Sequence, residues 1–260
     1  MKAPYRYKNQ VQAAFSRAQD YDLWAQTHTD VAQNLADWIN KAEPAPQSFV
    51  LEVGGGTGCL AQALMPRLKP LRWLCTDISP AMLGRARTKL GQLWPQGLFA
   101  AMDMEKLAVR PCFDLAVSSM ALQWAVDMRK VLAGLWQCLR PGGILAVAVP
   151  GDGTFRQWRQ ACEDLGLECG LRDFPRIEDL AAMLPGPGQI LQESHRINFA
   201  KALDFPRYLK GLGGNVPKPG GKPLPPKAFR AVLNRLDADS QGLQLDYQVL
   251  LALAIKEHQG

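Results

Sequence analysis

A glycine-rich turn directly after an apolar run is the first place in this chain where residue types and spacing indicate chemistry. Residues 49–53 are almost entirely apolar, and Gly54-Gly55-Gly56-Thr57-Gly58 follows them. Glycine adopts backbone angles that other residues avoid, and its missing side chain lets a ligand approach the backbone closely. The residues after the turn are expected to be helical. A strand, a glycine turn and a helix in this order predict a binding loop for a nucleotide-like ligand.

Three acids stand where such a ligand would meet them. Asp77 ends the next expected strand, about 20 residues beyond the turn, where a carboxylate accepts hydrogen bonds from ribose hydroxyls. Asp103 ends the third expected strand, where it can accept from an adenine amine, and Glu52 precedes the glycines. A dehydrogenase is the weaker interpretation, because its GxGxxG spacing would need glycine at Cys59. The pattern favours a cofactor that contains adenosine.

Alternating strands and helices are needed to bring these residues to one edge of a sheet. Short apolar runs indicate strands, and amphipathic segments between them indicate helices, which implies a parallel sheet covered on both faces. Thr154 is expected to cap its helix, and the last strand is expected to lie inside the sheet because it is long and apolar. The expected strands are 49–53, 72–77, 98–101, 113–118, 144–149, 189–199 and 243–255, and the expected helices are 60–68, one from 79–80, 128–139 and 154–165.

Two further helical regions flank this core in the sequence. Residues 5–40 are expected to be helical with a break near Asp20, and helices at 202–212 and 228–236 precede the last strand. Between Phe205 and Arg235 there are seven Lys or Arg residues and no acid. Such a one-signed stretch either attracts an acidic partner or is a solvated face.

The composition excludes several classes of protein. The chain has 260 residues, 47% of them hydrophobic, which is typical of a globular protein. No apolar run reaches the length of about 18 residues that spans a membrane, and the first residues lack the apolar core of a signal peptide, so we expect a cytoplasmic protein without a membrane partner. The six cysteines form no CxxC pair and are expected to be reduced core thiols, and the three histidines lack metal-ligand spacing, so no metal is expected.

Several segments together resemble one enzyme family. The pattern Glu52-x-Gly-x-Gly-x-Gly with Asp77 and Asp103 resembles the class I S-adenosylmethionine-dependent methyltransferases. The segment 121–124, Ala-Leu-Gln-Trp, is similar to the Ala-x-Gln-Trp segment of the malonyl-[acyl-carrier protein] O-methyltransferases, which begin pimeloyl synthesis for biotin. Residues 11–22 resemble the entry helix of that family, and residues 207–213 resemble its Arg-x-Leu-Lys-x-x-Gly segment.

The resemblance implies a fold and an activity. The fold would be α/β, the Rossmann-like class I methyltransferase fold, with a mostly parallel seven-stranded sheet and helices on both faces. A helical lid would occupy residues 1–45, and the methyltransferase domain would occupy residues 46–260, with a basic helical insert at 202–236 before the last strand. The enzyme would transfer a methyl group from S-adenosylmethionine to the free carboxylate of malonyl on acyl carrier protein.

The same resemblance implies roles for individual residues. The family often has Cys at the position of Gly55, a difference expected to be harmless in a turn, and Asn at the position of Ser119. Arg207 is the candidate for holding the malonyl carboxylate. Tyr21 is the expected catalytic residue; the expected substrate-binding residues are Gln123, Trp124, Arg207 and Lys210; the expected cofactor-binding residues are Arg17, Glu52, Gly54, Gly55, Gly56, Gly58, Asp77, Ile78, Met82, Asp103, Met104 and Ser119.

Two alternatives stay open. A methyltransferase for quinones or other small molecules on the same fold would share every cofactor motif. A non-catalytic binding module, recruited to nucleic acid by the basic stretch, would be expected to have lost the cofactor acids, and Glu52, Asp77 and Asp103 are all present. An RNA methyltransferase would need more stacking aromatic residues in the basic stretch than the three found there, so no nucleic acid partner is expected.

Overall fold

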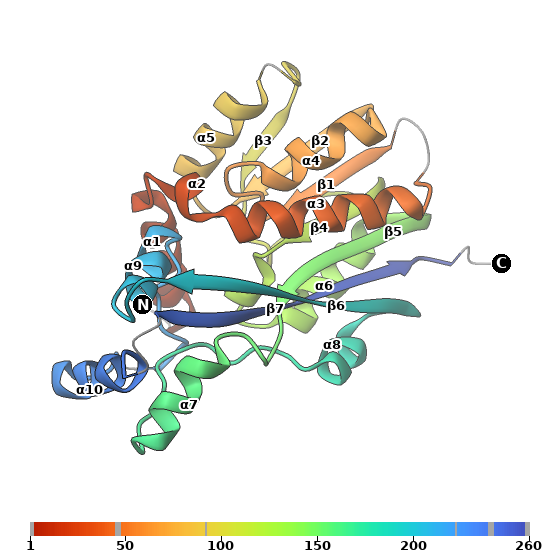
Figure 1. Ribbon diagram of the computed structural model, residues 1–260. Coiled ribbons are helices and arrows are strands. Elements are labelled where there is room, and N and C mark those ends of the chain that lie inside the picture. The colour runs from red at the N-terminus through yellow and green to blue at the C-terminus, as the bar shows by residue number, and fades with distance from the viewer. Residues whose placement is uncertain (1–2, 45–47, 92, 222, 239–241, 258–260) are drawn as a thin grey trace. The chain divides into compact units, whose positions relative to one another are not determined.

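Seven strands form one sheet in the computed structural model of this protein (Figure 1). The structure describes residues 3–44, 48–91, 93–221, 223–238 and 242–257. The strand order is β3-β2-β1-β4-β5-β7-β6, and the pairs β3–β2, β2–β1, β1–β4 and β4–β5 are parallel. The predicted α/β class and the mostly parallel seven-stranded sheet are confirmed.

The strands and helices follow one another along the chain in the alternation that the sequence indicates. The strands are β1 (Phe49–Val53), β2 (Arg72–Asp77), β3 (Leu98–Ala101), β4 (Phe113–Ser119), β5 (Leu139–Pro150), β6 (Gly188–Phe199) and β7 (Leu243–Ile255). The helices are α1 (Ala3–Arg17), α2 (Tyr21–Trp24), α3 (Gln26–Lys41), α4 (Cys59–Leu68), α5 (Pro80–Leu90), the short η1 (Leu122–Trp124), α6 (Met128–Cys138), α7 (Arg156–Asp164), α8 (Ile177–Met183), α9 (Asp204–Gly211) and α10 (Pro226–Leu236).

The chain divides into two compact units. The first, here called the sheet unit, contains Ala25–Val149, Ile177–Gln192 and Leu250–Gly260. The second, here called the aromatic unit, contains Met1–Trp24, Pro150–Arg176 and Glu193–Val249. Strands β6 and β7 contribute residues to both units. The lid boundary expected at residue 45 stays a prediction.

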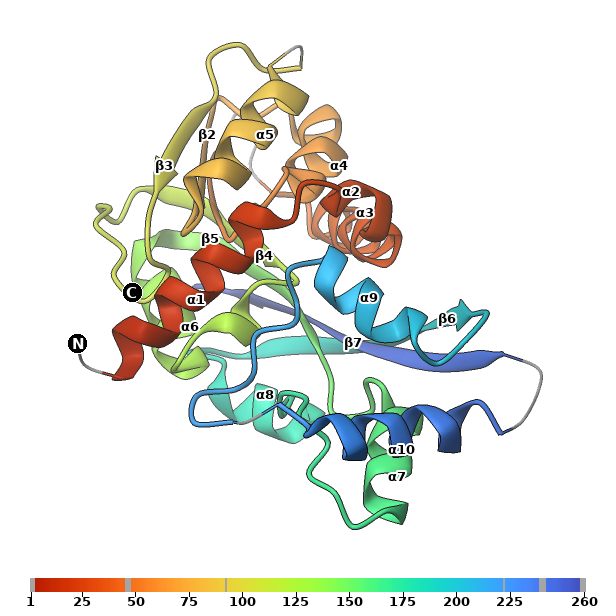
Figure 2. The same ribbon diagram turned by 90° about the vertical axis from the view of Figure 1, so that its left-hand side faces the viewer.

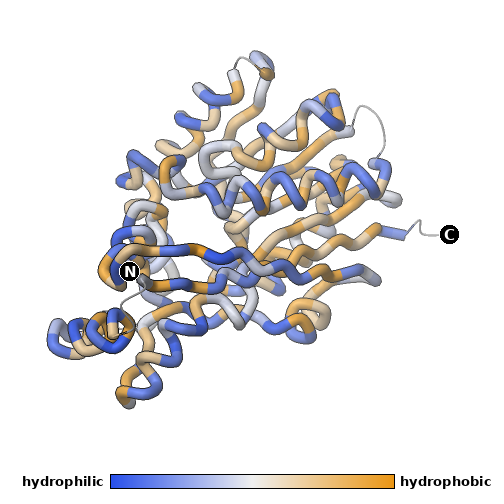
Figure 3. Tube along the Cα trace, in the orientation of Figure 1, coloured by the Kyte–Doolittle hydropathy of each residue, from blue (hydrophilic) through white to orange (hydrophobic). Residues whose placement is uncertain are grey.

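The sheet unit is built around strands that are covered on both faces. Residues 143–149 of β5 are all buried, which explains why they are continuously apolar rather than alternating. Helices α3 and α4 lie on one face of the central strands and α6 on the other, as two views at right angles show (Figures 1 and 2). The central strands have mostly hydrophobic colours in Figure 3, whereas the colour of α3 alternates between hydrophobic and hydrophilic along the helix. The core of the sheet unit includes the fully buried Leu51, Leu132 and Leu145. The burial of each leucine stabilises the folded state by about 1.5–3 kcal/mol.

The aromatic unit has a core of ring side chains. The Phe155 ring lies 4.7 Å from the Phe205 ring and 4.9 Å from the Tyr247 ring, both edge-on. The Trp158 ring lies 5.0 Å from the Phe205 ring. Edge-on ring pairs add about 0.5–1.5 kcal/mol to the burial of their area. These contacts fix α9, which carries Phe205, against α7 and β7.

Most predicted elements are confirmed to within a few residues, and β1, β2, β3 and β7 have the predicted bounds. The predicted cap at Thr154 is wrong: α7 begins at Arg156, and the Thr154 hydroxyl donates to the carbonyl of Gln248, 2.7 Å away. Strand β7 lies inside the sheet as predicted, but next to the edge strand β6. Helix α8 was not predicted. No helix of the described residues is long and apolar enough to cross a membrane.

Candidate active site

The glycine turn after β1 has the conformation that only glycine adopts without strain. Gly54, Gly56 and Gly58 have φ values of +65°, +55° and +86°. A Cβ atom on Gly54 would lie 2.3 Å from the Cβ of Ala121, so the turn touches the segment after β4. On Gly56 a Cβ atom would meet nothing within 4 Å, so the turn is open on that side. The turn therefore offers bare backbone to a ligand.

Asp77 fixes the turn from the end of β2. One carboxylate oxygen accepts from the Gly56 backbone N–H at 3.0 Å, and the other accepts from the Ser79 N–H at 2.7 Å. The side chain is buried, and this burial raises the pKa of Asp77. A carboxylate has about four acceptor sites, so both oxygens can still accept from ribose hydroxyls. The predicted neighbourhood of Asp77 and the glycine turn is thus present.

Glu52 lies beneath the turn rather than on its open side. Its Oε2 accepts from the indole N–H of Trp73 at 3.0 Å, and its side chain is 1% exposed. Burial raises the pKa of Glu52 to about 7. A Cβ atom on Gly55 would lie 2.3 Å from the sulfur of Cys75 and 3.2 Å from the Glu52 carboxyl carbon. This chain therefore has room only for glycine at position 55.

A buried hydroxyl at the end of β4 has no partner. The Ser119 Oγ atom makes no hydrogen bond with any residue that the structure describes. The next residue, Met120, has a φ of +53°, which costs a residue with a side chain about 1–2 kcal/mol. The carbonyl of Met120 accepts from the Gln123 side-chain amide at 2.8 Å. An unpaired buried hydroxyl also costs free energy, and a ligand that hydrogen-bonds to Ser119 would recover it.

The end of β3 completes this side of the sheet. The half-buried Asp103 accepts from the Glu105 N–H at 3.0 Å. The methyl group of Met104 would lie 3.6 Å from a Cβ atom on Gly54, so the chain after β3 reaches the glycine turn. Ile78 is half-buried, whereas Met82 is fully buried in α5 with its N–H bonded to the Ser79 hydroxyl at 3.3 Å.

Four of the other predicted site residues belong to the aromatic unit, whereas the half-buried Trp124 ends η1 in the sheet unit. Arg17 is exposed at the end of α1, and the half-buried Tyr21 begins α2, its ring 6.5 Å from the Phe15 ring. Arg207 and Lys210 are exposed on α9. Arg207 donates to the carboxylate of Asp204 at 3.1 Å. The residues predicted from the two ends of the sequence are therefore found in one compact unit.

Two glycines explain how the segments 11–22 and 207–213 meet. A Cβ atom on Gly211 would lie 2.4 Å from the ring of Trp24. Gly213 has a φ of +67°, and a Cβ atom there would lie 3.2 Å from the Cα of Phe15. Each glycine lets α9 or the turn after it approach the N-terminal helices more closely than any side chain would. The two sequence segments thus form one structural feature.

Several cations of the basic stretch pair with acidic side chains in the structure, so the stretch is less uniformly positive there than in the sequence. Arg207 pairs with Asp204, Lys218 with Asp173 at 2.8 Å, and Arg235 with Asp164 at 3.1 Å. All three acids come from outside the stretch, and Asp204 directly precedes it. Lys222 lies outside the described residues.

Comparisons with known proteins agree on one family. The methyltransferase domain family matches residues 51–145. The chain is 36% identical over 238 residues to a malonyl-[acyl-carrier protein] O-methyltransferase of Magnetococcus marinus, covering 91% of this chain and 88% of that protein. The chain belongs to the malonyl-[acyl-carrier protein] O-methyltransferase family. It is also 36% identical to the biotin biosynthesis bifunctional protein BioCD of Bordetella avium, covering 94% of this chain and 52% of that protein.

The fold agrees with this family assignment. The YcgJ protein of Bacillus subtilis has a TM-score of 0.64 with 15% sequence identity, covering 86% of this chain and 99% of that one. The chain is therefore a methyltransferase with the class I fold, and S-adenosylmethionine is its cofactor. The open backbone at Gly56 and the unpaired Ser119 hydroxyl fit that cofactor.

Sequence reasoning missed two residues of this malonyl-[acyl-carrier protein] O-methyltransferase family member. Ala121 and Cys75 leave no room for a side chain at Gly54 and Gly55 of the turn, although neither carries a functional group that the ligand needs. Nothing in their own neighbourhood in the sequence indicates this role. The strand pairing, in which Cys75 lies beside Glu52, reveals the role of Cys75, and the close approach of Ala121 to Gly54 reveals that of Ala121.

Proposed function

We propose that this enzyme methylates the free carboxylate of a malonyl group carried on acyl carrier protein, as the first step of pimeloyl formation for biotin. The observation that carries the proposal is 36% identity across 91% of the chain to a protein named for this activity. S-adenosylmethionine supplies an activated methyl group when it is bound. The substrate carboxylate is already ionised at pH 7, since its reference pKa is near 4. The protein therefore needs no general base.

The residues' task is then to position the two reactants and exclude water. We assign Asp77 to the ribose hydroxyls and Asp103 to the adenine amine. The backbone of the glycine turn would approach the cofactor, and the unpaired Ser119 hydroxyl would accept or donate a hydrogen bond at its methionine part. The buried position of Glu52 supports an indirect role for that residue, in which it holds the turn from below.

The substrate-binding assignments rest on the family resemblance. Tyr21 is proposed as the catalytic residue, and Gln123 and Trp124 are proposed to bind the substrate. Arg207 is exposed and already paired with Asp204, so two roles are distinguishable by kinetics. A contact to malonyl would make Arg207→Ala lower turnover on small and carrier-linked substrates alike. A contact to the carrier would raise KM for the carrier-linked substrate alone.

Acyl carrier protein is the proposed macromolecular partner. Lys210, Lys227 and Arg230 are exposed, and an acidic carrier would be attracted to them. The expected cytoplasmic location is part of this proposal, as is a lid formed by residues 1–45. Limited proteolysis with and without S-adenosylmethionine tests the lid, because a lid should be cut more slowly when the cofactor is bound. Equal rates of cutting would contradict it.

The decisive experiment is mass spectrometry of the carrier protein after incubation with the enzyme and S-adenosylmethionine. Malonyl-carrier protein should gain the mass of one CH₂ group. Acetyl-carrier protein, which lacks the free carboxylate, is the matched control and should gain nothing. Methylation of a phenol or quinone with no gain on malonyl-carrier protein would overturn the proposal in favour of a small-molecule methyltransferase.

A further inference from the structure

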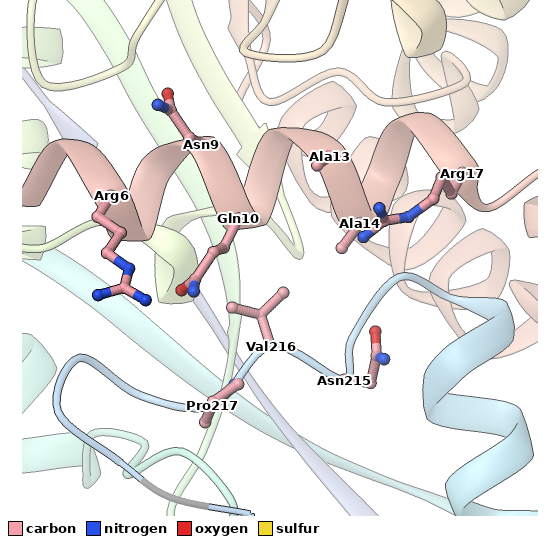
Figure 4. Close-up of a pocket in the computed structure, with 9 residues that line it drawn as sticks. All are labelled: Arg6, Asn9, Gln10, Ala13, Ala14, Arg17, Asn215, Val216 and Pro217. Atoms are coloured by element: carbon pink, nitrogen blue, oxygen red, sulfur yellow. The ribbon is translucent and has the colours of Figure 1, made fainter.

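One face of α1 forms the wall of a cavity of about 470 Å³ within the aromatic unit. The opposite wall is the segment 215–217 (Figure 4). The helix contributes Arg6, Gln10, Ala13 and Arg17, whose spacing of three or four residues places them along one stripe. Figure 4 shows the side chains of Arg6 and Gln10 directed toward Val216 and Pro217. We call this feature the α1 groove.

The α1 groove carries positive charge at its ends and amides between them. Its lining has two guanidinium groups and three side-chain amides, from Asn9, Gln10 and Asn215, but no carboxylate. Arg6 and Arg17 make no ion pair or side-chain hydrogen bond with any residue that the structure describes. Ala13 leaves the middle of the stripe free of a long side chain. This arrangement suits a ligand with an anionic group and hydrogen-bonding amides.

The walls of the α1 groove are connected by a half-buried arginine. The Arg172 guanidinium donates to the Tyr7 hydroxyl on α1 and to the carbonyl of Pro217 at 3.5 Å. It also lies 5.0 Å from the centre of the Tyr7 ring, within the range of a cation–π contact. Next to Pro217, Lys218 pairs with Asp173 at 2.8 Å. One residue thus connects both walls, so the groove is a defined part of the unit rather than a gap beside a loop.

The segment that carries Arg172 is itself held in place. Arg159 on α7 donates to the carbonyls of Thr154 and Arg172, and its guanidinium lies 5.6 Å from the Phe174 ring. The indole N–H of Trp158 donates to the carbonyl of Cys169 at 3.1 Å. The segment 169–174 therefore has a set conformation, and Arg172 projects from it toward the groove.

The length of the groove selects among anionic ligands. Arg6 and Arg17 are eleven residues apart on one helix, which corresponds to about 16 Å along its axis. The arm that carries malonyl on acyl carrier protein has a phosphodiester at one end, two amides and a thioester. From phosphorus to the malonyl carboxylate it has about as many chain atoms as a five-residue peptide, which spans about 17 Å when extended. The arm and the stripe match in length, in charge and in the order of their groups.

We propose that the α1 groove binds the phosphopantetheine arm, with its phosphodiester at Arg6 and its thioester end toward Arg17. This inference rests on the proposed function, since it requires a carrier-linked substrate. The direction follows from Tyr21, the proposed catalytic residue, which lies four residues after Arg17. Gln10 and Asn215 hydrogen-bond the amides of the arm. Arg172 is a positioning residue that holds the two walls at the right separation.

The variant Arg6→Gln tests the phosphodiester contact. Its KM and kcat are measured with three malonyl thioesters. Malonyl-carrier protein and malonyl-coenzyme A contain the phosphate, whereas the N-acetylcysteamine thioester of malonate does not. Arg6→Gln should raise KM about tenfold for the two substrates with phosphate, which is the lower end for a charged hydrogen bond at an exposed site. It should leave kcat, and both constants for the short thioester, unchanged. Arg110→Gln, which removes an exposed guanidinium in the sheet unit, is the matched control and should change nothing.

Two results would overturn the groove proposal. One is a KM that Arg6→Gln leaves unchanged for all substrates, and the other is an equal rise for the thioester without phosphate. Ala13→Leu, which narrows the groove without changing charge, should also raise KM for substrates with the full arm. A normal KM in both variants would leave the groove without a role in substrate binding.

A binding measurement separates this proposal from the proposed function. Holo-carrier protein has the arm and apo-carrier protein lacks it, and neither needs to be methylated. The wild-type enzyme should bind the holo form more tightly, and Arg6→Gln should remove that difference. An arm-dependent affinity without any methyl transfer would refute the proposed function and keep the groove. Normal methyl transfer with equal affinity for both forms would refute the groove alone.

Discussion

Replacing Glu52 by glutamine should make the protein more stable at alkaline pH and change its stability little at acidic pH. Glutamine keeps the carbonyl oxygen that accepts from the Trp73 indole, so the hydrogen bond of 3.0 Å can be retained. What it removes is a carboxyl group that ionises inside the protein. The side chain is 1% exposed, so its ionised form is poorly solvated in the folded state.

The magnitude follows from the pKa. Burial raises the pKa of Glu52 from 4.5 to about 7, which at 1.36 kcal/mol for each unit corresponds to about 3 kcal/mol. The folded state binds the Glu52 proton more tightly than the unfolded state does. The contribution of the protonated carboxyl group to the free energy of unfolding is therefore fully present below pH 4.5. It is lost as pH rises through about 7. Above that pH the wild-type protein carries the whole cost and the variant carries none.

The assay is urea unfolding of both proteins at pH 5 and pH 8 without cofactor. The free energy of unfolding of Glu52→Gln, relative to wild type, should be about 2–3 kcal/mol higher at pH 8 than at pH 5. Other titrating groups are common to both proteins and cancel in this comparison. Glu163→Gln, at an exposed glutamate, should show no such difference. A relative stability of Glu52→Gln that is the same at both pH values would refute the reasoning.

Three further outcomes are expected. Asp77→Asn should weaken S-adenosylmethionine binding about tenfold or more, because a charged hydrogen bond is worth about 1.5–3 kcal/mol; unchanged affinity in isothermal titration would contradict the ribose contact. Gly213→Ala should lower the free energy of unfolding by about 2–3 kcal/mol, because the new Cβ atom is strained by the positive φ and is also too close to α1. Gly220→Ala should lower it by about 1 kcal/mol, because a Cβ atom there meets nothing within 4 Å. Equal losses in urea unfolding would count against the packing argument. Lys227→Glu with Arg230→Glu should raise KM for malonyl-carrier protein mainly at low salt, because exposed charges are screened beyond about 8 Å at physiological salt; a rise that does not depend on salt would speak against electrostatic docking.

Local signals predicted the fold well wherever burial alone decides the structure. Strand β7 was predicted with its correct bounds because its first half alternates between apolar and polar residues and its second half is continuously apolar. Both patterns are typical of strands. Helix α8 was not, because it has only seven residues and one buried side chain, Leu180, so its sequence has no clear period. The cap at Thr154 was predicted wrongly because its hydroxyl bonds a strand that lies far away in the sequence, at Gln248.

The candidate site divides in the same way. The glycine turn and Asp77 were predicted because both lie at strand ends, and strand ends can be read from the sequence. The α1 groove could be recognised only in part: the stripe from Arg6 to Arg17 has helical spacing, but its second wall depends on Arg172, which the sequence does not connect to α1. The charge of the basic stretch was overestimated because Asp164 and Asp173 come from other segments.

The cysteine beneath the glycine turn has a consequence for oxidative damage. Cys75 is buried, and its burial together with the nearby Glu52 and Asp77 raises its pKa well above the usual value. The thiolate is the form of cysteine that attacks peroxides and disulfide reagents, and at neutral pH almost none of this sulfur is a thiolate. Cys59, Cys112 and Cys169 are half-buried and meet such reagents first. The same packing that admits only glycine at position 55 thus keeps the floor of the proposed cofactor site chemically inert, so the enzyme can retain a thiol there in a cell under oxidative stress.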